Sequence, residues 1–247
     1  MSCTAALATD RERRGDDRAF ICIKTVEREK LYALHFSKTS RQEQEVLLSD
    51  WLLVLIAQAV GAERGLMLPG SFNPVHKGHL EMLEAAEKIT GLRGVFELSC
   101  TNVDKPELSE EEILRRASAI CDIPVALTFA PRFTQKAELF PNTTFVLGHD
   151  TAERLVDYAD GSEWEKFQTL ETSFLVAGRV FQPLGKNKGG GSASFQPLEK
   201  KKGGGSASFQ CLENLNLPEG FESLFNAIPE STFREDISST GLRGEGR

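Results

Sequence analysis

The sequence predicts an α/β fold: a Rossmann-like α/β/α parallel sheet covered by helices on both faces, with a small α+β appendage at the N-terminus. From residue 66 onward, short apolar runs alternate with amphipathic segments, and this alternation of strands and helices is typical of a parallel sheet. A glycine turn follows the first of these runs and leads into a segment with helical spacing. Such strand–turn–helix junctions present free backbone N–H groups to an anion.

Residues 1–64 are expected to form the appendage. Residues 19–23 are apolar and β-prone, and residues 31–36 alternate between apolar and polar side chains, so each run predicts a strand. Residues 41–60 predict an amphipathic helix with a charged first turn. His35, near the end of the second strand, is expected to be an ordinary half-buried residue.

Residues 65–180 carry the elements of the expected core. A helix over residues 80–89 should end at Gly91, and another should begin after Ser109, which has capping-box spacing with Glu112. In the first of these helices the side chains expected to face inward are Leu80, Leu83, Ala85 and Ala86. The expected core strands are the apolar runs at residues 66–68, 95–98, 125–128, 143–147 and 173–177.

Residues 181–212 interrupt this pattern. A Phe-Gln-x-Leu segment begins at positions 181, 195 and 209, and a Lys-Gly-Gly-Gly-Ser-Ala-Ser segment also recurs. Two full units are too few and too rich in glycine and serine to stack as a solenoid. We interpret them as a flexible insertion or a tandem duplication, with polyphosphate binding by the lysines as the alternative. Residues 213–247 are expected to complete the core.

The composition is that of an ordinary globular protein, with 40% hydrophobic and 26% charged residues among 247. A net charge of -7 disfavours general nucleic-acid binding. The longest apolar run, residues 51–57, is too short to cross a bilayer, so no membrane partner is expected. The five scattered cysteines include no Cys-x-x-Cys pair, which favours reduced thiols and a cytoplasmic location over a zinc site or disulfide framework.

The strongest chemical pattern is the turn after residues 66–68. It reads Gly-Ser-Phe-Asn-Pro at residues 70–74, and His76 and His79 follow it. Gly70 allows a sharp turn and a close approach of the backbone to a ligand. The two histidines are three positions apart, so they share one face of a helix that starts there and can stabilise charge on a phosphate. The alternative is that they merely cap that helix.

These residues resemble the signature of the nucleotidyltransferase superfamily, which includes cytidylyltransferase-like and nicotinamide-nucleotide adenylyltransferase-like enzymes. Its members carry a Gly-Ser-Phe-Asn-Pro-type turn followed by His-x-Gly-His or Thr-x-Gly-His, and the match here is uninterrupted. The resemblance covers approximately residues 65–180 and 213–243. It implies attack by an acceptor phosphate on the α-phosphate of a nucleoside triphosphate, with pyrophosphate leaving, His76 and His79 as catalytic residues, and Mg²⁺ carried by the triphosphate rather than by protein ligands.

A second match lies near the end of the chain. Residues 237–243, Ile-Ser-Ser-Thr-Gly-Leu-Arg, resemble the family's Ile-Ser-Ser-Thr-x-x-Arg motif, whose hydroxyls and arginine would hold the triphosphate. Family members continue into a helix there, so the four residues after Arg243 predict triphosphate binding with reduced turnover. The nucleotide- and phosphate-binding residues that the resemblance implies are Gly70, Ser71, Phe72, Lys105, Ser238, Ser239, Thr240 and Arg243.

Three further residues carry open alternatives. Gly148-His149-Asp150 resembles the family's Gly-x-Asp segment near the ribose and acceptor, so Gly148 and Asp150 are expected there; the alternative for Asp150 is a helix N-cap. Lys105 is a phosphate contact or loop surface. Trp164 stacks on a base or packs in the core.

Residues 14–61 resemble the final portion of the competence-damage-inducible amidase family, which includes nicotinamide mononucleotide deamidases. The resemblance rests on an Arg-Gly-Asp start, two strands and an acid-rich helix. The serine-bearing body of that family is absent, so no catalytic role is carried over.

The first hypothesis for function is therefore adenylyl transfer from ATP to nicotinamide mononucleotide, within NAD biosynthesis. One alternative is transfer from ATP or CTP to phosphopantetheine or a phospho-alcohol. Another is a nucleotide-binding protein with weak turnover. The oligomeric state stays open.

Overall fold

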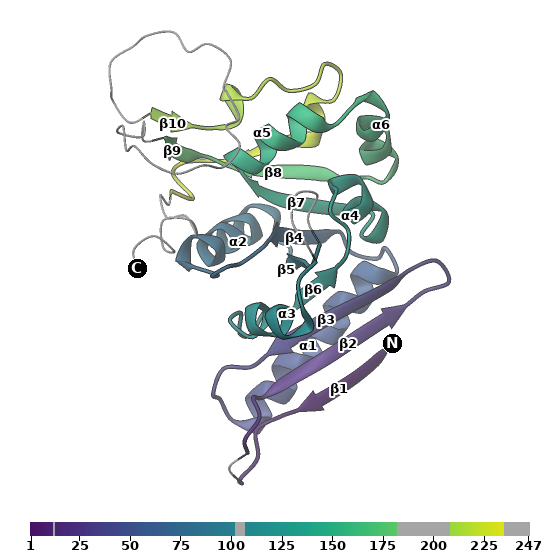
Figure 1. Ribbon diagram of the computed structural model, residues 1–247, viewed down its shortest axis with the longest axis vertical. Helices are drawn as coiled ribbons and strands as arrows, with labels where there is room; N and C mark the ends of the chain where they lie inside the picture. Colours follow the sequence, from purple (N-terminus) through teal and green to yellow (C-terminus); the bar gives the residue numbers. More distant parts are fainter. Residues whose placement is uncertain (12, 102–106, 182–207, 235–247) are drawn as a thin grey trace.

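The computed structural model describes residues 1–11, 13–101, 107–181 and 208–234, and it is built around one sheet with nine described strands (Figure 1). In spatial order these strands are β1 (Ser2–Ala6), β2 (Arg18–Lys24), β3 (Glu29–His35), β6 (Val125–Thr128), β5 (Gly94–Ser99), β4 (Gly65–Gly70), β7 (Thr143–Gly148), β8 (Ser173–Ala177) and β11 (Phe225–Ile228). A separate pair consists of β9 (Arg179–Phe181) and β10 (Ser208–Gln210).

Six of these strands, from β6 to β11, run parallel to one another. The helices that connect or flank the strands are α1 (Arg41–Ala59), α2 (Lys77–Thr90), α3 (Glu110–Ala117), α4 (Phe133–Leu139), α5 (His149–Tyr158) and α6 (Gly161–Thr169). Two short 3₁₀ turns, Leu212–Asn214 and Glu222–Leu224, precede β11. The predicted Rossmann-like α/β fold is confirmed.

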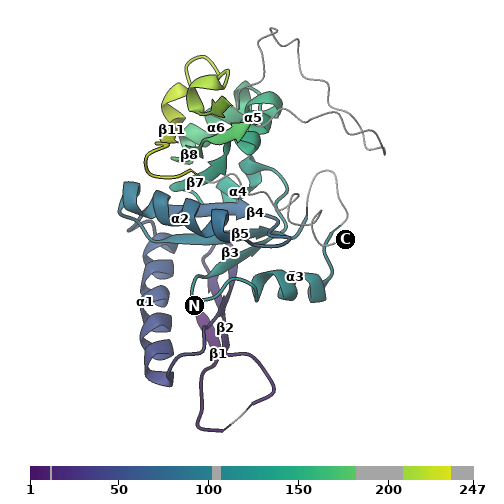
Figure 2. The same ribbon diagram turned by 90° about the vertical axis from the view of Figure 1, so that its left-hand side faces the viewer.

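Side chains along the central strands alternate between two apolar cores, one on each face of the sheet. On β4, Leu66 and Leu68 belong to the core formed with α2 and α3, whereas Met67 belongs to the core formed with α1, α4, α5 and α6. Figure 2 shows α1 and α3 on opposite sides of the N-terminal strands. Both faces are therefore covered, which is why the parallel strands are apolar throughout.

The N-terminal strands extend the same sheet. β1, β2 and β3 pair in antiparallel fashion, and β3 pairs antiparallel with β6, Leu31 lying opposite Leu127. On α1, the Trp51 indole donates to the Asp122 carbonyl oxygen at 3.0 Å and the Arg93 guanidinium lies 3.7 Å above its ring. The division at residue 64 stays a prediction, but the sheet and both apolar cores run across it.

Helix ends follow the predicted signals in two cases. Gly91 ends α2 with φ 71, the left-handed conformation that favours glycine. Ser109 caps α3 by accepting from the Glu112 N–H at 3.3 Å, while the Glu112 carboxylate pairs with arginines of its own helix.

The expectation that Leu80 faces inward is wrong, since it is 44% exposed. It lies about 120° around α2 from the buried Ala86.

Within the described ranges, no helix combines the length and apolar composition that a membrane span requires.

Candidate functional site

The Gly70 turn lies where the order of the strands reverses. After β4 the chain adds β5 and β6 on one side, and it then crosses to place β7 and β8 on the other side of β4 (Figure 1). Because these strands are parallel, the ends of β4 and β7, at Gly70 and Gly148, lie on the same edge of the sheet. Crevices at such reversal points are the usual ligand sites of open α/β sheets.

Phe72 fixes the shape of the turn. Its ring is 2% exposed and meets the rings of Phe96 and His79 edge-on, with centroid distances of 5.0 and 5.2 Å. Its φ of 42 lies in the left-handed region that non-glycine residues rarely adopt. A Cβ on Gly70 would come within 2.7 Å of the Phe72 ring, so this position requires glycine. Any contact of Phe72 with a nucleotide must therefore come from its backbone.

The two predicted histidines lie together at the start of α2. His76 is the N-cap residue and His79 is in the first turn, and their rings stack with centroids 3.7 Å apart. The His76 N–H donates to His79 Nδ1 at 3.2 Å. This bond places the proton of neutral His79 on Nε2, which can then donate to a ligand. The first turn of α2 contains no acidic residue, so its N–H groups favour an anion.

Burial, and then the neighbouring His76, lower the pKa of His79 to about 4. His79 is therefore a neutral donor throughout the range in which an ordinary histidine titrates. In the unfolded chain its pKa returns to the usual 6.5, so the unfolded state binds more protons between pH 6.5 and 4. The neutral His79 imidazole therefore stabilises the folded state above pH 6.5, and this stabilisation is lost as the pH falls toward 4.

We expect an NMR titration to show the His79 imidazole protonating near pH 4. A second test is the free energy of unfolding measured as a function of pH. Between pH 6.5 and 4 this free energy should fall less in a His79→Gln variant than in the wild type. A His79 titration midpoint near 6.5 would contradict both the neutral state and the donor role derived from it.

Two arginines of α3 hold the turn from the side. Arg116 donates to the Ser71 carbonyl oxygen at 2.9 Å, and Arg115 donates to Asn73 Oδ1 at 3.0 Å. Both guanidiniums bind Glu112, whose hydrogen bonds from Arg115 and then Arg116 lower its pKa to about 2. Sequence reasoning missed this support because α3 lies some forty residues away along the chain. The Ser71 side chain stays exposed, as phosphate binding needs.

The second predicted segment lies at the end of the neighbouring strand. Gly148 is the N-cap of α5, and Asp150 is exposed in its first turn. The alternative that Asp150 is the N-cap of a helix over residues 152–158 is wrong, because α5 begins at His149, three residues earlier than the sequence suggests. Asp150 therefore lies at the same edge as the Gly70 turn.

The remaining predicted residues divide into two groups. Trp164 is 3% exposed and packs among Phe167, Phe174 and Phe225, so the base-stacking alternative is wrong. The repeat insertion lies almost wholly outside the described residues. So do the predicted phosphate contacts Lys105, Ser238, Ser239, Thr240 and Arg243.

A buried ion pair braces the same edge of the sheet, and sequence reasoning missed it. Lys136 of α4 lies 2.6 Å from Glu97 Oε1 on β5, and the two side chains are 3% and 0% exposed. Lys136 also donates to Ser99 Oγ at 2.9 Å, and the Thr128 hydroxyl donates to Glu97. A glutamate inside the apolar run Val-Phe-Glu-Leu was the available signal, since buried carboxylates need partners.

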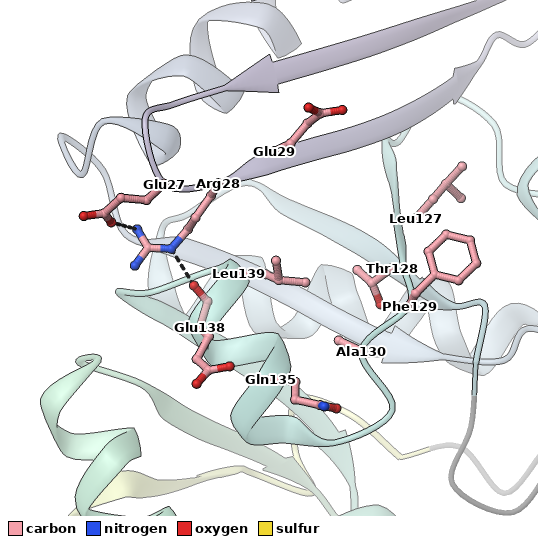
Figure 3. Close-up of a pocket in the computed structure, with 10 residues that line it drawn as sticks. All are labelled: Glu27, Arg28, Glu29, Leu127, Thr128, Phe129, Ala130, Gln135, Glu138 and Leu139. Carbon is pink, nitrogen blue, oxygen red and sulfur yellow. Dashed lines mark hydrogen bonds and ion pairs between the residues drawn. The ribbon is translucent and has the colours of Figure 1, made fainter.

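A pocket of about 590 Å³ opens at the end of β6, within the size range of small-molecule sites (Figure 3). Arg28, in the turn between β2 and β3, closes one side by donating to the Glu138 carbonyl oxygen at 2.6 Å and pairing with Glu27 at 3.3 Å. The Phe129 ring, on a residue that is 58% exposed, lies on the other side in Figure 3. The full lining is Glu27, Arg28, Glu29, Leu127, Thr128, Phe129, Ala130, Gln135, Glu138 and Leu139.

The described residues include no group of three or more His, Cys, Asp or Glu side chains that could hold a metal ion. The part played by Mg²⁺ stays a prediction.

In a comparison with protein families, the cytidylyltransferase-like family model matches residues 67–245 of the chain. This range includes both histidines, the Gly148 segment and the C-terminal Ser-Ser-Thr motif. A comparison with curated proteins finds no significant match.

Proposed function

Since the chain belongs to the cytidylyltransferase-like family, a nucleotidyltransferase family, we propose that it adenylylates a phosphorylated acceptor, nicotinamide mononucleotide, and releases pyrophosphate. The observation that carries the proposal is the stacked His76–His79 pair, at the start of α2 and at the strand-order reversal. It combines a neutral imidazole donor with the positive end of the α2 dipole, and both suit a phosphate that gains charge.

In the proposed reaction an acceptor phosphate oxygen attacks the α-phosphorus of the triphosphate. A new P–O bond forms as the bond to the β-phosphate oxygen breaks, and pyrophosphate leaves with that electron pair. The Nε2–H of His79 donates to an α-phosphate oxygen, with His76 beside it. Catalysis then rests on positioning and charge stabilisation, and no covalent enzyme intermediate is required.

The pocket beside Phe129 supports the choice of acceptor. It opens at the end of β6, which is two strands from β4, so the ends of these two strands are about 10 Å apart. A mononucleotide can span that distance, with its phosphate at the turn and its ring against Phe129. The lining carries three carboxylates, those of Glu27, Glu29 and Glu138, against the single guanidinium of Arg28. Each carboxylate pairs with a basic side chain, Arg28, Lys24 or Lys166, but two of these three bases lie outside the lining. The remaining excess of negative charge in the lining favours a cationic ring such as a pyridinium.

Mg²⁺ is expected to enter with the triphosphate. It binds proteins through one or two carboxylates together with phosphate oxygens, and the exposed carboxylate of Asp150 at the same edge fits that donor set. When bound, the ion would neutralise charge on the phosphates; positioning of the phosphates remains the task of the Gly70 turn and α2.

A pyrophosphate-release screen tests the proposal. We would offer ATP, CTP, GTP and UTP with nicotinamide mononucleotide, phosphopantetheine and small phospho-alcohols. The expected result is turnover with ATP and nicotinamide mononucleotide. If only another compound supports turnover, that compound replaces nicotinamide mononucleotide as the proposed acceptor. Triphosphate binding by calorimetry without turnover would favour a binding protein, and no binding of any triphosphate would overturn both.

Phe129→Ala should raise the KM for the acceptor about tenfold or more and leave the KM for ATP unchanged, because an aromatic contact is worth about 0.5–1.5 kcal/mol beyond its buried area. Steady-state kinetics with each substrate varied in turn would measure both constants. Leu53→Ala is the matched control, since Leu53 is 67% exposed on α1, away from the pocket. Equal effects of the two substitutions on the acceptor KM would remove Phe129 from the site.

A further inference from the structure

We propose that the outward face of α1 binds the same face of a second copy of this chain, in a two-fold symmetric dimer. α1 packs against the N-terminal strands through a buried face that includes Trp51 and Leu55. Its opposite face is turned away from the sheet, and Figure 2 shows the helix along the left side of the molecule. Four large apolar side chains on that face are exposed, and we call them the outer stripe: Val46, Leu53, Ile56 and Val60.

The outer stripe sets α1 apart from the next helix of the chain. On the exposed side of α2, Lys77 and Lys88 form ion pairs with glutamates of the same helix. Residues 46–60, by contrast, contain one charged residue, Asp50. A helix that is apolar on both faces is normally covered on both. The part of the chain that the structure describes covers only the inner face of α1, so the outer face needs a partner.

The outer stripe is large enough to serve as a binding surface. Val46 is 57% exposed, Leu53 is 67% exposed and Val60 is 71% exposed. The stripe thus exposes on the order of 400 Å² of apolar surface, and contiguous patches of this size are often functional. With the flanking helix surface, two copies would bury the roughly 1,000 Å² that a specific interface needs. Such an interface is at the small end of its class, so we expect a reversible dimer with a Kd of about 1 μM or weaker.

The spacing of the stripe indicates that its partner is the same chain. Val46 and Val60 each lie seven residues from Leu53, within about 20° of it around the helix. In an antiparallel pair of helices centred on Leu53, Val46 therefore meets Val60 of the second copy, and Leu53 meets its own copy. Ser49 meets Ala57 in the same register, and these small side chains allow the helices to approach closely. This self-complementarity is what a two-fold interface requires.

The polar side chains beside the stripe are compatible with a protein partner. The Ser49 hydroxyl already donates to the Glu45 carbonyl oxygen at 2.8 Å, so it can be buried without losing a hydrogen bond. Asp50 lies about 60° around the helix from Leu53, so its carboxylate stays at the rim of the interface. A helix that binds a membrane surface usually carries basic residues on its polar face, but residues 42–60 contain no Lys or Arg. The sequence of α1 therefore favours a second copy over a lipid surface.

The dimer would leave the proposed catalytic site open. None of the stripe residues lines the pocket beside Phe129. The Trp51 indole fixes α1 to the carbonyl oxygen of Asp122, just before β6 begins, whereas the Gly70 turn lies at the opposite edge of the sheet. The proposal therefore does not depend on nucleotidyl transfer.

Sedimentation velocity on the full chain would test the proposal over a series of micromolar concentrations. The mass should rise with concentration from that of one copy, 27.3 kDa, toward twice that value. Leu53→Glu places two carboxylates against each other at the two-fold axis, so it should weaken the dimer about a hundredfold or more. Ile89→Glu is the matched control, because Ile89 is an apolar residue of α2 that is 44% exposed and lies outside the stripe. Both variants should keep the circular dichroism spectrum of the wild type, since both side chains are exposed.

Cross-linking tests the antiparallel register separately. Val46→Cys and Val60→Cys proteins would be mixed and treated with a short bismaleimide. Mass spectrometry of the linked peptides would distinguish the new links from those of the native cysteines. We expect a link between positions 46 and 60 of different copies. The two copies of position 46 lie about 20 Å apart in this register, so a direct link between them would overturn it.

Three further results would overturn the dimer. The first is a wild type that keeps the mass of one copy at every concentration. The second is an equal loss of association in Leu53→Glu and Ile89→Glu. The third is a monomer that floats with phosphatidylcholine vesicles and loses this binding in Leu53→Glu, because lipid would then be the partner of the outer stripe.

Discussion

His79→Ala is expected to lower kcat by about a hundredfold or more while the protein stays folded. The imidazole lies in the first turn of α2, where the His76 N–H fixes its tautomer and burial keeps it neutral. Its Nε2–H is thus aligned before substrate arrives, and loss of one such transition-state donor costs about 3 kcal/mol. Steady-state kinetics with ATP and nicotinamide mononucleotide would measure the loss. The KM for ATP should change far less than kcat.

A structural role for the ring would give a different pattern. His79 also meets Phe72 edge-on, so in that case its removal would disturb the Gly70 turn and lower turnover indirectly. His79→Gln separates the two, because its amide can donate from a position close to that of Nε2 but cannot reproduce the aromatic contacts. Partial recovery of kcat in His79→Gln, with thermal unfolding matched to His79→Ala, supports the donor. Equal turnover of wild type and His79→Ala would remove His79 from the mechanism.

The predicted parts of the fold are those whose signals are local. The strands of the parallel core are apolar runs, and the ends of α2 and α3 have their own capping residues, Gly91 and Ser109. Two missed strands lack such signals. β1 is almost wholly exposed, and its conformation comes from pairing with β2. β11 has two exposed residues in its centre and is extended because it pairs with β8.

The candidate site likewise contains residues that the sequence could place together and residues that only the folded structure brings near. The glycine turn and both histidines lie within ten positions, so the sequence could place them together. Arg115 and Arg116, which hold that turn, come from a helix that only tertiary packing brings near. Phe72 belongs to the motif and is predicted to bind the nucleotide, yet its ring is buried in the core.

The pairing of β3 with β6 could not be predicted either. Nothing in the composition of residues 1–64 says which edge of the core they join. That pairing brings the turn at Arg28 against α4 and makes it one side of the pocket beside Phe129. The appendage therefore contributes to the edge of the sheet that carries the candidate site, which the resemblance of residues 14–61 to an amidase did not suggest.

Removal of the Lys136 charge is expected to be among the most destabilising single changes in the chain. Lys136→Ala would leave Glu97 buried and without its ion-pair partner, and such a loss costs about 3–5 kcal/mol. Urea denaturation at neutral pH would measure the free energy of unfolding. Lys88→Ala is the matched control, because Lys88 forms a pair of equal length, 2.6 Å, with Glu84 on the exposed face of α2. Exposed pairs of this kind contribute little.

The double variant Glu97→Leu/Lys136→Met distinguishes the burial of an unpaired charge from a simple loss of packing. If the unpaired carboxylate causes the loss, replacing both partners by apolar side chains of similar volume should recover most of the stability. A packing defect would instead persist in the double variant. The pair also fixes α4, whose residues line the pocket beside Phe129, so Lys136→Ala should raise the KM for the acceptor at temperatures where the variant remains folded. An unfolding free energy no lower than that of Lys88→Ala would show that the pair does not brace this edge of the sheet.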